Sequence, residues 1–551
     1  MSRTRSLPPH TRHVKLGGEF ARIRREDLPV HRRFARRLRL RVRLVAATLG
    51  VLALAGCTTG PSVRPAVIDN DGRNTPSPKS STAPVPLPPL TQPQSSALRW
   101  ADCGQDTRER IGDPAVPASL QFSCARMTAP LDAPDDTQRL LARIYLLKVG
   151  NGPIPLAVVN DVGGEPGTVY AARLAAQLPP AFLQKFSLIG MDRRGTGLSG
   201  GVQCAPDEVR SALLGADPTQ GGLGDVLDAA RRVGQQCAID LDTAQTALDS
   251  WRTAGDLDKL RQALGLDRLN ALGHGDGSKV LSEYAVRYPA QVGRMVLDGL
   301  PDPGDDRGAV LDAVAAGAQA TFDAFNADCA ARGCPLGDAK AALKAVTDRL
   351  RTAPVSGPDG LVVGPGVATY AAYVGLSDRT RWPALADALN SARNGDFAAL
   401  TAFADPVLVD ARGRASRISG MIATRCNDSS TRLPADQIDR AEAAMRTKYP
   451  QFGAAIAQEL AWCGAWPVRR EPLPAAGAPG APPILVAATA ADPVTPQVGT
   501  TRAADQMPSA VTVTWQGAGH GAVGQSPCVT AAVQGFLIDG KVPDTRTLCP
   551  A

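Results

Sequence analysis

Two residues near the C-terminus have the types and spacing of an acid–base pair. Asp492 follows the apolar run PILVAATA, and His520 lies in a glycine-flanked loop after AVTVTW. A carboxylate that holds one imidazole nitrogen leaves the other nitrogen to accept or release a proton. Three of the five histidines lie within the first 31 residues, which we expect to be removed. Imidazole chemistry in the mature chain therefore depends on His520, which we expect to be the base, or on His274, which we expect to pack.

The nucleophile for such a pair is expected in a tight turn between a buried strand and a helix, where G-x-S-x-G raises a serine hydroxyl above the sheet. This chain has GHGDG over residues 273–277, between the mostly apolar run 268–272 and an amphipathic helical pattern over 278–288. The order 275, 492, 520 matches nucleophile, acid and histidine. The turn glycines are present, but the nucleophile position is Gly275, which has no reactive group.

A second loop has the composition of an anion-binding turn. Gly163 and Gly164 follow the apolar run 154–161, and small residues there let backbone N–H groups approach a developing negative charge. We expect these glycines and the N–H of Asp276 to form an oxyanion hole.

The elements that must position these residues alternate along the chain. Apolar runs over 142–148, 154–161, 186–192, 268–272 and 294–299 are separated by helical patterns, which predicts an α/β fold with a mostly parallel, doubly wound sheet. Residues 305–475 change to Ala-rich helical sequence, typical of an inserted helical cap. Strand patterns return at 483–490 and 510–515. We therefore predict a core over 98–304 and 476–551, interrupted by the cap.

The charge is concentrated at the N-terminus. Residues 1–43 have a net charge of +11, so the rest of the chain carries −4 of the overall +7. Nothing beyond the terminal arm therefore suggests nucleic-acid binding, because the basic surplus lies in that arm. A basic region followed by the apolar stretch 44–52 predicts a signal peptide. Residues 58–97, rich in Pro, Ser and Thr, predict an extended tether.

The segment Leu54-Ala55-Gly56-Cys57 resembles a bacterial lipobox. That resemblance implies a signal peptide over residues 1–57, with cleavage before Cys57 and lipid attached to its sulfur. We therefore expect an exported protein anchored to the outer face of the cell membrane, because two or three acyl chains hold a protein firmly.

Ten cysteines remain after Cys57, an even number that favours disulfides in an exported chain. The simplest hypothesis pairs them sequentially, although other connectivities stay open: Cys103–Cys124, Cys204–Cys237, Cys329–Cys334, Cys426–Cys463 and Cys528–Cys549. No close C-x-x-C pair occurs and histidine is scarce, so we expect no metal site and no cofactor.

Several motifs together resemble one family. They are VVNDVGGEPG, MDRRGTGLSG, LNALGHGDGS, YPAQVGRMVLDG, CGAWP and ADPVTP followed by GAGHG. From about Leu98 to Cys549 the chain is similar to exported tripeptidyl-aminopeptidase-like α/β-hydrolases of actinobacteria, relatives of prolyl aminopeptidases. The resemblance implies a helical lid and serine peptidase chemistry that releases short N-terminal peptides. It assigns the acid to Asp492, the base to His520 and the nucleophile to position 275.

Two departures from the family's pattern predict that this chain has impaired serine peptidase activity. Gly275 replaces the serine, and the loop Asn160–Gly167 reads NDVGGEPG where the family has a pattern like NPGGPG. Loss of the serine alone costs about 10⁶ in turnover in a serine protease. We therefore favour a pseudoenzyme that binds a short peptide or acyl ligand.

Two other hypotheses remain. A working hydrolase would use Asp492 and His520 with water or another nucleophile such as Ser278. Dinucleotide binding would use the glycine turn with Asp298 at the end of the next strand. The last hypothesis fails in detail, because its third glycine is Ser278 and it leaves the Asp492–His520 pair unexplained.

Overall fold

The structure is a computed structural model that describes residues 86–112, 116–134, 140–410, 416–468, 471, 473–474 and 477–551. The predicted signal peptide, Cys57 and most of the predicted tether lie outside the described residues. Within the described part of the chain, no helix is both long and apolar enough to cross a membrane.

One mixed sheet forms the centre of the core. Within the described residues it has ten strands, in the order β1-β2-β3-β5-β4-β6-β7-β10-β11-β12. The bounds are β1 Ala101–Asp102, β2 Phe122–Pro130, β3 Leu141–Val149, β4 Ile154–Val159, β5 Phe186–Met191, β6 Leu269–His274, β7 Val292–Asp298, β10 Ile484–Ala491, β11 Ala510–Ala518 and β12 Thr547–Cys549. Pairings from β1 to β5 are antiparallel, and those from β5 to β12 are parallel.

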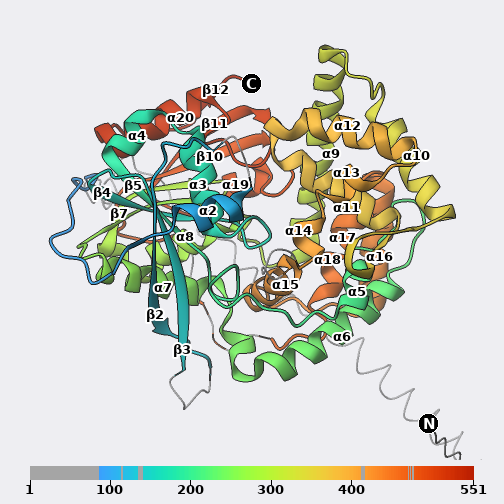
Figure 1. The fold of residues 1–551 in the computed structure, drawn as a ribbon, viewed down its shortest axis with the longest axis horizontal. Helices are drawn as coiled ribbons and strands as arrows, with labels where there is room; N and C mark the ends of the chain where they lie inside the picture. Colours follow the sequence, from blue (N-terminus) through green and yellow to red (C-terminus); the bar gives the residue numbers. More distant parts are fainter. Residues whose placement is uncertain are drawn as a thin grey trace, which may run out of the picture. The chain divides into compact units, whose positions relative to one another are not determined.

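Helices cover both faces of this sheet (Figure 1). The helices of the core are α2 Gly104–Ile111, α3 Gly167–Gln177, α4 Pro180–Lys185, α7 Ser250–Ala263, α8 Asp276–Arg287, α19 Gln497–Asp505 and α20 Pro527–Gln534. Residues of α3, α4 and α20 form one apolar cluster with the sheet, and residues of α7, α8 and α19 form another.

The strands are apolar on both sides because both faces are covered. Successive side chains of a strand point to opposite faces, and β4 shows this directly. Leu156 and Val158 join the cluster with α3, whereas Ala157 and Val159 join the cluster with α8. A sheet buried on both faces needs near-continuous apolar runs. The predicted α/β fold with a mostly parallel sheet is therefore confirmed.

A second group of helices forms the cap. The bounds are α9 Arg307–Arg332, α10 Ala339–Thr352, α11 Pro365–Ser377, α12 Trp382–Arg393, α13 Ala398–Thr401, α14 Asp405–Leu408, α15 Arg417–Asp428, α16 Ala435–Lys448, α17 Gly453–Ala457 and α18 Glu459–Trp462. A short antiparallel pair, β8 Val355–Ser356 and β9 Val362–Val363, lies among them. These helices share a large apolar cluster, which Val162, Leu248 and Ala518 of the core also join.

The cap also includes a segment that the sequence placed in the core. Helices α5 (Asp207–Leu213) and α6 (Gly224–Leu241) bury Leu213, Val226 and Val233 in the apolar cluster of the cap. The prediction of a cap confined to 305–475 was too narrow, because the apolar faces of α5 and α6 find their partners among residues that follow much later in the chain.

The predicted tether is shorter than residues 58–97, since residues 86–97 lie against the core. Leu87 and Leu90 pack on the cluster that contains α3. The Arg294 guanidinium donates a hydrogen bond to the Pro88 carbonyl at 3.1 Å, and the Ala97 amide donates to the Ala263 carbonyl at 2.8 Å. The body of the protein therefore begins before Leu98.

All five predicted disulfides are present: Cys103–Cys124, Cys204–Cys237, Cys329–Cys334, Cys426–Cys463 and Cys528–Cys549. The largest sequence separation between partners is 37 residues, so each bridge joins neighbouring elements. Such a set of bridges is typical of a protein that folds in an oxidising compartment.

One buried ion pair holds the loop after β5 to α7. Arg194 and Asp256 have side chains that are 3% and 1% exposed. The guanidinium donates to both carboxylate oxygens, at 2.8 and 2.6 Å, and also to the carbonyl oxygens of Leu131 and Ala247. Every charged atom of this pair is therefore compensated inside the protein.

Removing one partner of that pair should be strongly destabilising. In Asp256→Ala the guanidinium of Arg194 stays buried without its counter-ion, and we expect the free energy of unfolding to fall by about 3–5 kcal/mol. Asp228→Ala is the matched control, because Asp228 pairs with Arg231 at the surface, where a pair contributes about 0–1 kcal/mol. Urea unfolding with the disulfides intact measures both, and equal losses in the two variants would contradict this account.

Candidate functional site

The predicted acid and base meet at the carboxyl ends of β10 and β11. Nδ1 of His520 lies 3.0 Å from Oδ1 of Asp492. Asp492 is fully buried, and its carboxylate also accepts hydrogen bonds from the backbone amides of Val494, Thr495 and Gly521 at 2.8, 2.7 and 3.0 Å. These amides fix the carboxylate, which in turn fixes the orientation of the imidazole ring.

The turn between β6 and α8 has the backbone of a nucleophile elbow. Gly275 has φ 57° and ψ −127°, a backbone conformation that residues other than glycine rarely adopt. Its amide donates to the Asp298 carbonyl at 2.9 Å. Gly277 packs so closely that a Cβ there would lie 2.2 Å from the Val159 carbonyl oxygen. The predicted strand–turn–helix is therefore present, with the apex at Gly275.

The carboxylate of Asp161 occupies the space above this apex. Its Oδ2 lies 2.5 Å from Nε2 of His520, and its Oδ1 accepts a hydrogen bond from the Asp276 amide at 2.7 Å. A Cβ built on Gly275 would lie 2.0 Å from Oδ2 and 2.3 Å from Cγ of Asp161. The side chain of Asp161 thus lies where a serine side chain would lie, and it engages both the histidine that would activate that serine and the amide of the expected oxyanion hole.

Sequence reasoning missed Asp161 as a site residue. The signals were the unusual loop NDVGGEPG and the missing serine at Gly275. Each signal can be seen separately in the sequence. Only the three-dimensional structure shows that the carboxylate of Asp161 fills the space left by the missing serine side chain at Gly275.

The site holds an imidazole ring between two carboxylates. Burial acts to lower the pKa of His520, but the charges of Asp492 and Asp161 outweigh it and hold that pKa well above its usual value. Burial acts to raise the pKa of both carboxyls, and the charge of His520 with its hydrogen bonds lowers each below its usual value. Because Nε2 faces Asp161, the ring directs no free nitrogen at a reacting group in this arrangement.

The predicted oxyanion residues surround Asp161. The Asp276 amide is engaged by its carboxylate, and the Gly164 amide donates to the Asp161 carbonyl at 3.2 Å. A Cβ on Gly163 would lie 2.9 Å from Sδ of Met421 in α15, so this glycine lets the cap approach the loop. None of these observations leaves an open anion hole, and the assignment of Gly163, Gly164 and Asp276 stays a prediction.

Asp276 and Arg193 connect this loop to the loop after β5. Oδ1 of Asp276 accepts the Val162 amide at 3.0 Å and pairs with the Arg193 guanidinium. Burial raises the pKa of Asp276, while the charge of Arg193 acts to lower it. This pair orients the amide of Asp276 toward Asp161.

His274 and Ser278 are also close to the apex. The His274 ring stacks on Tyr170 with centroids 5.0 Å apart and lies 4.3 Å from the His520 ring, in line with the expected packing role. Ser278 is fully buried, and its hydroxyl donates to the Asp298 carbonyl at 3.3 Å. The structure therefore gives Ser278 no path to a substrate as an alternative nucleophile.

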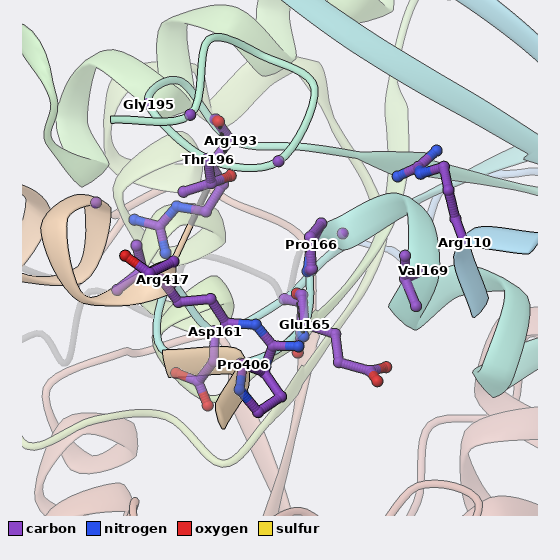
Figure 2. A pocket seen from close by; sticks show the side chains of 18 of the residues that line it. Arg110, Asp161, Glu165, Pro166, Val169, Arg193, Gly195, Thr196, Pro406 and Arg417 are labelled. Atoms are coloured by element: carbon purple, nitrogen blue, oxygen red, sulfur yellow. Dashed lines mark hydrogen bonds between the residues drawn. The ribbon is translucent and has the colours of Figure 1, made fainter. Parts of the chain in front are cut away.

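Two cavities meet at Asp161. The smaller, of about 230 Å³, lies between the loops after β4 and β5 and the cap. Figure 2 shows Asp161 among the side chains that line it, with Glu165, Arg193 and Arg417. The larger, of about 830 Å³, is lined by α8, α9 and the end of α15, and its volume suits a small molecule or short peptide.

The larger cavity has an acidic lining. Among the described residues, eight carboxylates line it against three cationic side chains, Lys279, Arg307 and Arg425. Glu459 of the cap pairs with both arginines. Glu283 differs from the other carboxylates because only Oε1 is paired, with Lys279, whereas Oε2 is buried without a hydrogen-bond partner. This combination favours a ligand that carries a positive charge.

Comparisons with known proteins agree with this architecture. The family described as TAP-like protein matches residues 449–549. Over 498 residues the chain is 29% identical to serine protease Hip1 of Mycobacterium tuberculosis H37Rv, covering 84% of this chain and 92% of that one. It is 32% identical over 495 residues to carboxylesterase B of the same organism, with the same coverage. It is 26% identical over 476 residues to tripeptidyl aminopeptidase of Streptomyces lividans, covering 82% and 88%.

Glu283 should make stability depend on pH. Burial raises its pKa to about 7, with Lys279 acting to lower it and Asp428 and Asp249 acting to raise it. Because the folded state holds this proton more tightly than the unfolded chain, stability should fall as pH rises from about 4.5 to 7, by about 3 kcal/mol in all. Glu283→Gln should remove that loss. Denaturant unfolding at several pH values measures the difference between parent and variant.

The matched control is Glu208→Gln, at an exposed position of α5. We expect its unfolding free energy to follow the parent at every pH. Parallel curves for the parent and Glu283→Gln would show that Glu283 ionises normally in the folded protein.

Proposed function

Because this chain belongs to the TAP-like α/β-hydrolases, we propose that it keeps the architecture of a serine hydrolase, has lost serine-nucleophile catalysis, and binds short peptide or acyl ligands. The observation that supports this proposal is the carboxylate of Asp161 in the space above Gly275. The serine hydroxyl is absent, and in addition the charged side chain of Asp161 occupies the space where that hydroxyl would lie.

The position of Asp161 also opposes the alternative of a working hydrolase that activates water. A water between Gly275 and His520 would need Nε2 as its proton acceptor and the Asp276 amide as an oxyanion donor. Nε2 of His520 and the Asp276 amide are both hydrogen-bonded to the carboxylate of Asp161, at 2.5 and 2.7 Å. Water activation at this place therefore requires Asp161 to leave first, at the cost of its two hydrogen bonds.

The acidic cavity supports a peptide amino terminus as the ligand. An ammonium group in this cavity could pair with the carboxylate of Glu283, and a small rotation of that side chain would give Oε2 the hydrogen bond that it lacks. Carboxylates of Asp302 and Asp305 line the same cavity. An acyl ligand would gain only apolar contacts there, so we favour the peptide among the two classes.

The proposal places the protein outside the cell membrane, anchored through lipid on Cys57. The five disulfides support export, since such bridges persist in oxidising compartments. A lipid anchor would keep the cavity close to the cell surface.

Restoring the serine should not be sufficient to restore activity. In Gly275→Ser the new Cβ collides with Asp161, so we expect little hydrolysis of tripeptide amides. In Gly275→Ser combined with Asp161→Ala, the hydroxyl can reach His520 and the amide of Asp276 is released. We expect the double variant to exceed the single variant by about 10²-fold or more, the scale of one oxyanion-hole donor. Fluorogenic tripeptide amides, assayed with a chelator present, give the rates.

The controls for that experiment are the parent and His520→Ala. We expect both to be equally inactive, and we expect His520→Ala to abolish the activity of the double variant. A parent protein that hydrolyses the substrates, and loses this activity with His520→Ala, would show that it is a working hydrolase and would refute the proposal.

Peptide binding should depend on the amino terminus. We expect trialanine amide to bind at least about tenfold more tightly than its N-acetylated form, since a charge-assisted hydrogen bond contributes about 1.5–3 kcal/mol. Glu283→Gln should reduce this preference, and Glu208→Gln should keep it. Isothermal titration of both peptides into the parent and the two variants measures all six affinities, and equal binding of the two peptides by the parent would argue against recognition of an amine.

A further inference from the structure

Three side chains at the apex have the types and spacing of metal ligands. Asp161, His274 and His520 each offer a donor atom, and these atoms lie within 4.8 Å of one another. From these residues we propose that the site binds one divalent transition-metal ion of the Zn²⁺ type, held by an imidazole nitrogen from each histidine and by Oδ2 of Asp161.

The side chains of His520 and Asp161 are already oriented, because in each the polar atom that would not bind the ion is held by a hydrogen bond. Nδ1 of His520 is held by Asp492 at 3.0 Å, which leaves Nε2 for the ion. Oδ1 of Asp161 is held by the Asp276 amide at 2.7 Å, which leaves Oδ2. Outer hydrogen bonds of this kind orient metal ligands in known sites, most often through a carboxylate behind a histidine.

His274 has a carboxylate behind it as well. Its Nδ1 lies 3.5 Å from Oδ2 of Asp298 and is buried without a hydrogen-bond partner. Asp298 is fixed by the amides of Ala522 and Val523, at 2.8 and 3.1 Å. A small rotation of the ring would complete the Nδ1 hydrogen bond and direct Nε2 at the ion. Both histidines therefore have the outer carboxylate that a metal site requires.

The spacing between His520 and Asp161 needs only a small adjustment, while His274 would have to bring its nitrogen closer from a separation of up to 4.8 Å. Ligands about 2.0–2.2 Å from one ion lie roughly 3–3.5 Å apart, whereas Nε2 of His520 and Oδ2 of Asp161 are 2.5 Å apart, joined by the proton of one hydrogen bond. Replacing that proton by the ion would open the pair by less than about 1 Å. Gly275 makes this possible, because a serine side chain would displace Asp161.

The donor set indicates which ions would bind. Two imidazoles and one carboxylate suit Zn²⁺ and neighbouring transition metals, whereas Mg²⁺ and Ca²⁺ prefer oxygen ligands only. Three protein ligands leave a position for water or substrate, and Asp161 lines the larger cavity. The expectation of no metal rested on the scarcity of histidine and did not count Asp161, which supplies the third ligand.

The test is direct metal binding by the purified protein after dialysis against a chelator. We expect one equivalent of Zn²⁺ by isothermal titration and by elemental analysis, no competition from excess Mg²⁺, and visible d–d absorption when Co²⁺ replaces Zn²⁺. Asp161→Asn and His274→Phe should each weaken binding at least about 100-fold, and Asp492→Asn should weaken it about 10–100-fold through the orientation of His520.

The matched control is Glu165→Gln in the same loop, where Glu165 pairs with Arg173 at 3.0 Å; it should bind like the parent. Circular dichroism of each metal-free variant verifies its fold, and His274→Phe keeps an aromatic ring against Tyr170. Absence of stoichiometric binding, or binding unchanged in both Asp161→Asn and His274→Phe, would overturn the proposal. The loss of serine chemistry would stand in either case, because the serine-rescue assay is run without metal.

Discussion

The site depends on one contact, the carboxylate of Asp161 against Nε2 of His520. The two side chains are 9% and 7% exposed, and desolvating a charge is costly unless it is paired and hydrogen-bonded. Here the imidazole lies between two carboxylates, and both carboxylates accept backbone amides. The contact exists only because Gly275 has no side chain. Glycine at the apex and aspartate in the loop are therefore one structural feature, although 114 residues separate them in the sequence.

Asp298 at the end of β7 connects the two halves of the site. Its carbonyl accepts the Gly275 amide and the Ser278 hydroxyl, which fixes the elbow. Its carboxylate accepts the amides of Ala522 and Val523, which fixes the loop that carries His520. A single strand end thus sets the distance between elbow and base. The cap adds a third constraint, since Met421 packs on Gly163 and holds the loop that carries Asp161.

The core was predictable from sequence because its signals are local. A covered parallel sheet needs continuous apolar runs, and the predicted runs 142–148, 154–161 and 186–192 correspond closely to β3, β4 and β5. The disulfides were predictable because each joins neighbouring segments. Motif order also brought Asp492 and His520 together correctly. Each of these signals lies within a short stretch of sequence.

The errors and omissions concern contacts between distant segments. Helices α5 and α6 have amphipathic patterns that show an apolar face, but such patterns do not show which surface covers it. The role of Asp161 is a contact across 359 residues with His520. The loop sequence predicted a turn, and turns do not reveal where their side chains point. The same reasoning explains residues 86–97, whose composition is typical of a tether but whose leucines find apolar partners on the core.

The presence of Asp492 and His520 has a structural reason that is separate from catalysis. The Asp492 carboxylate is fully buried and accepts the amides of Val494, Thr495 and Gly521. Without it, the buried amides of Thr495 and Gly521 would lose their acceptor, at a cost of about 1–3 kcal/mol each. His520 in turn supplies the positive charge that both Asp492 and Asp161 require. The dyad would therefore contribute to stability even in a chain that performs no hydrolysis, and its presence is not an argument for turnover. The occupant of the space above Gly275 is the informative feature, because a carboxylate there excludes a serine and offers a ligand to a cation.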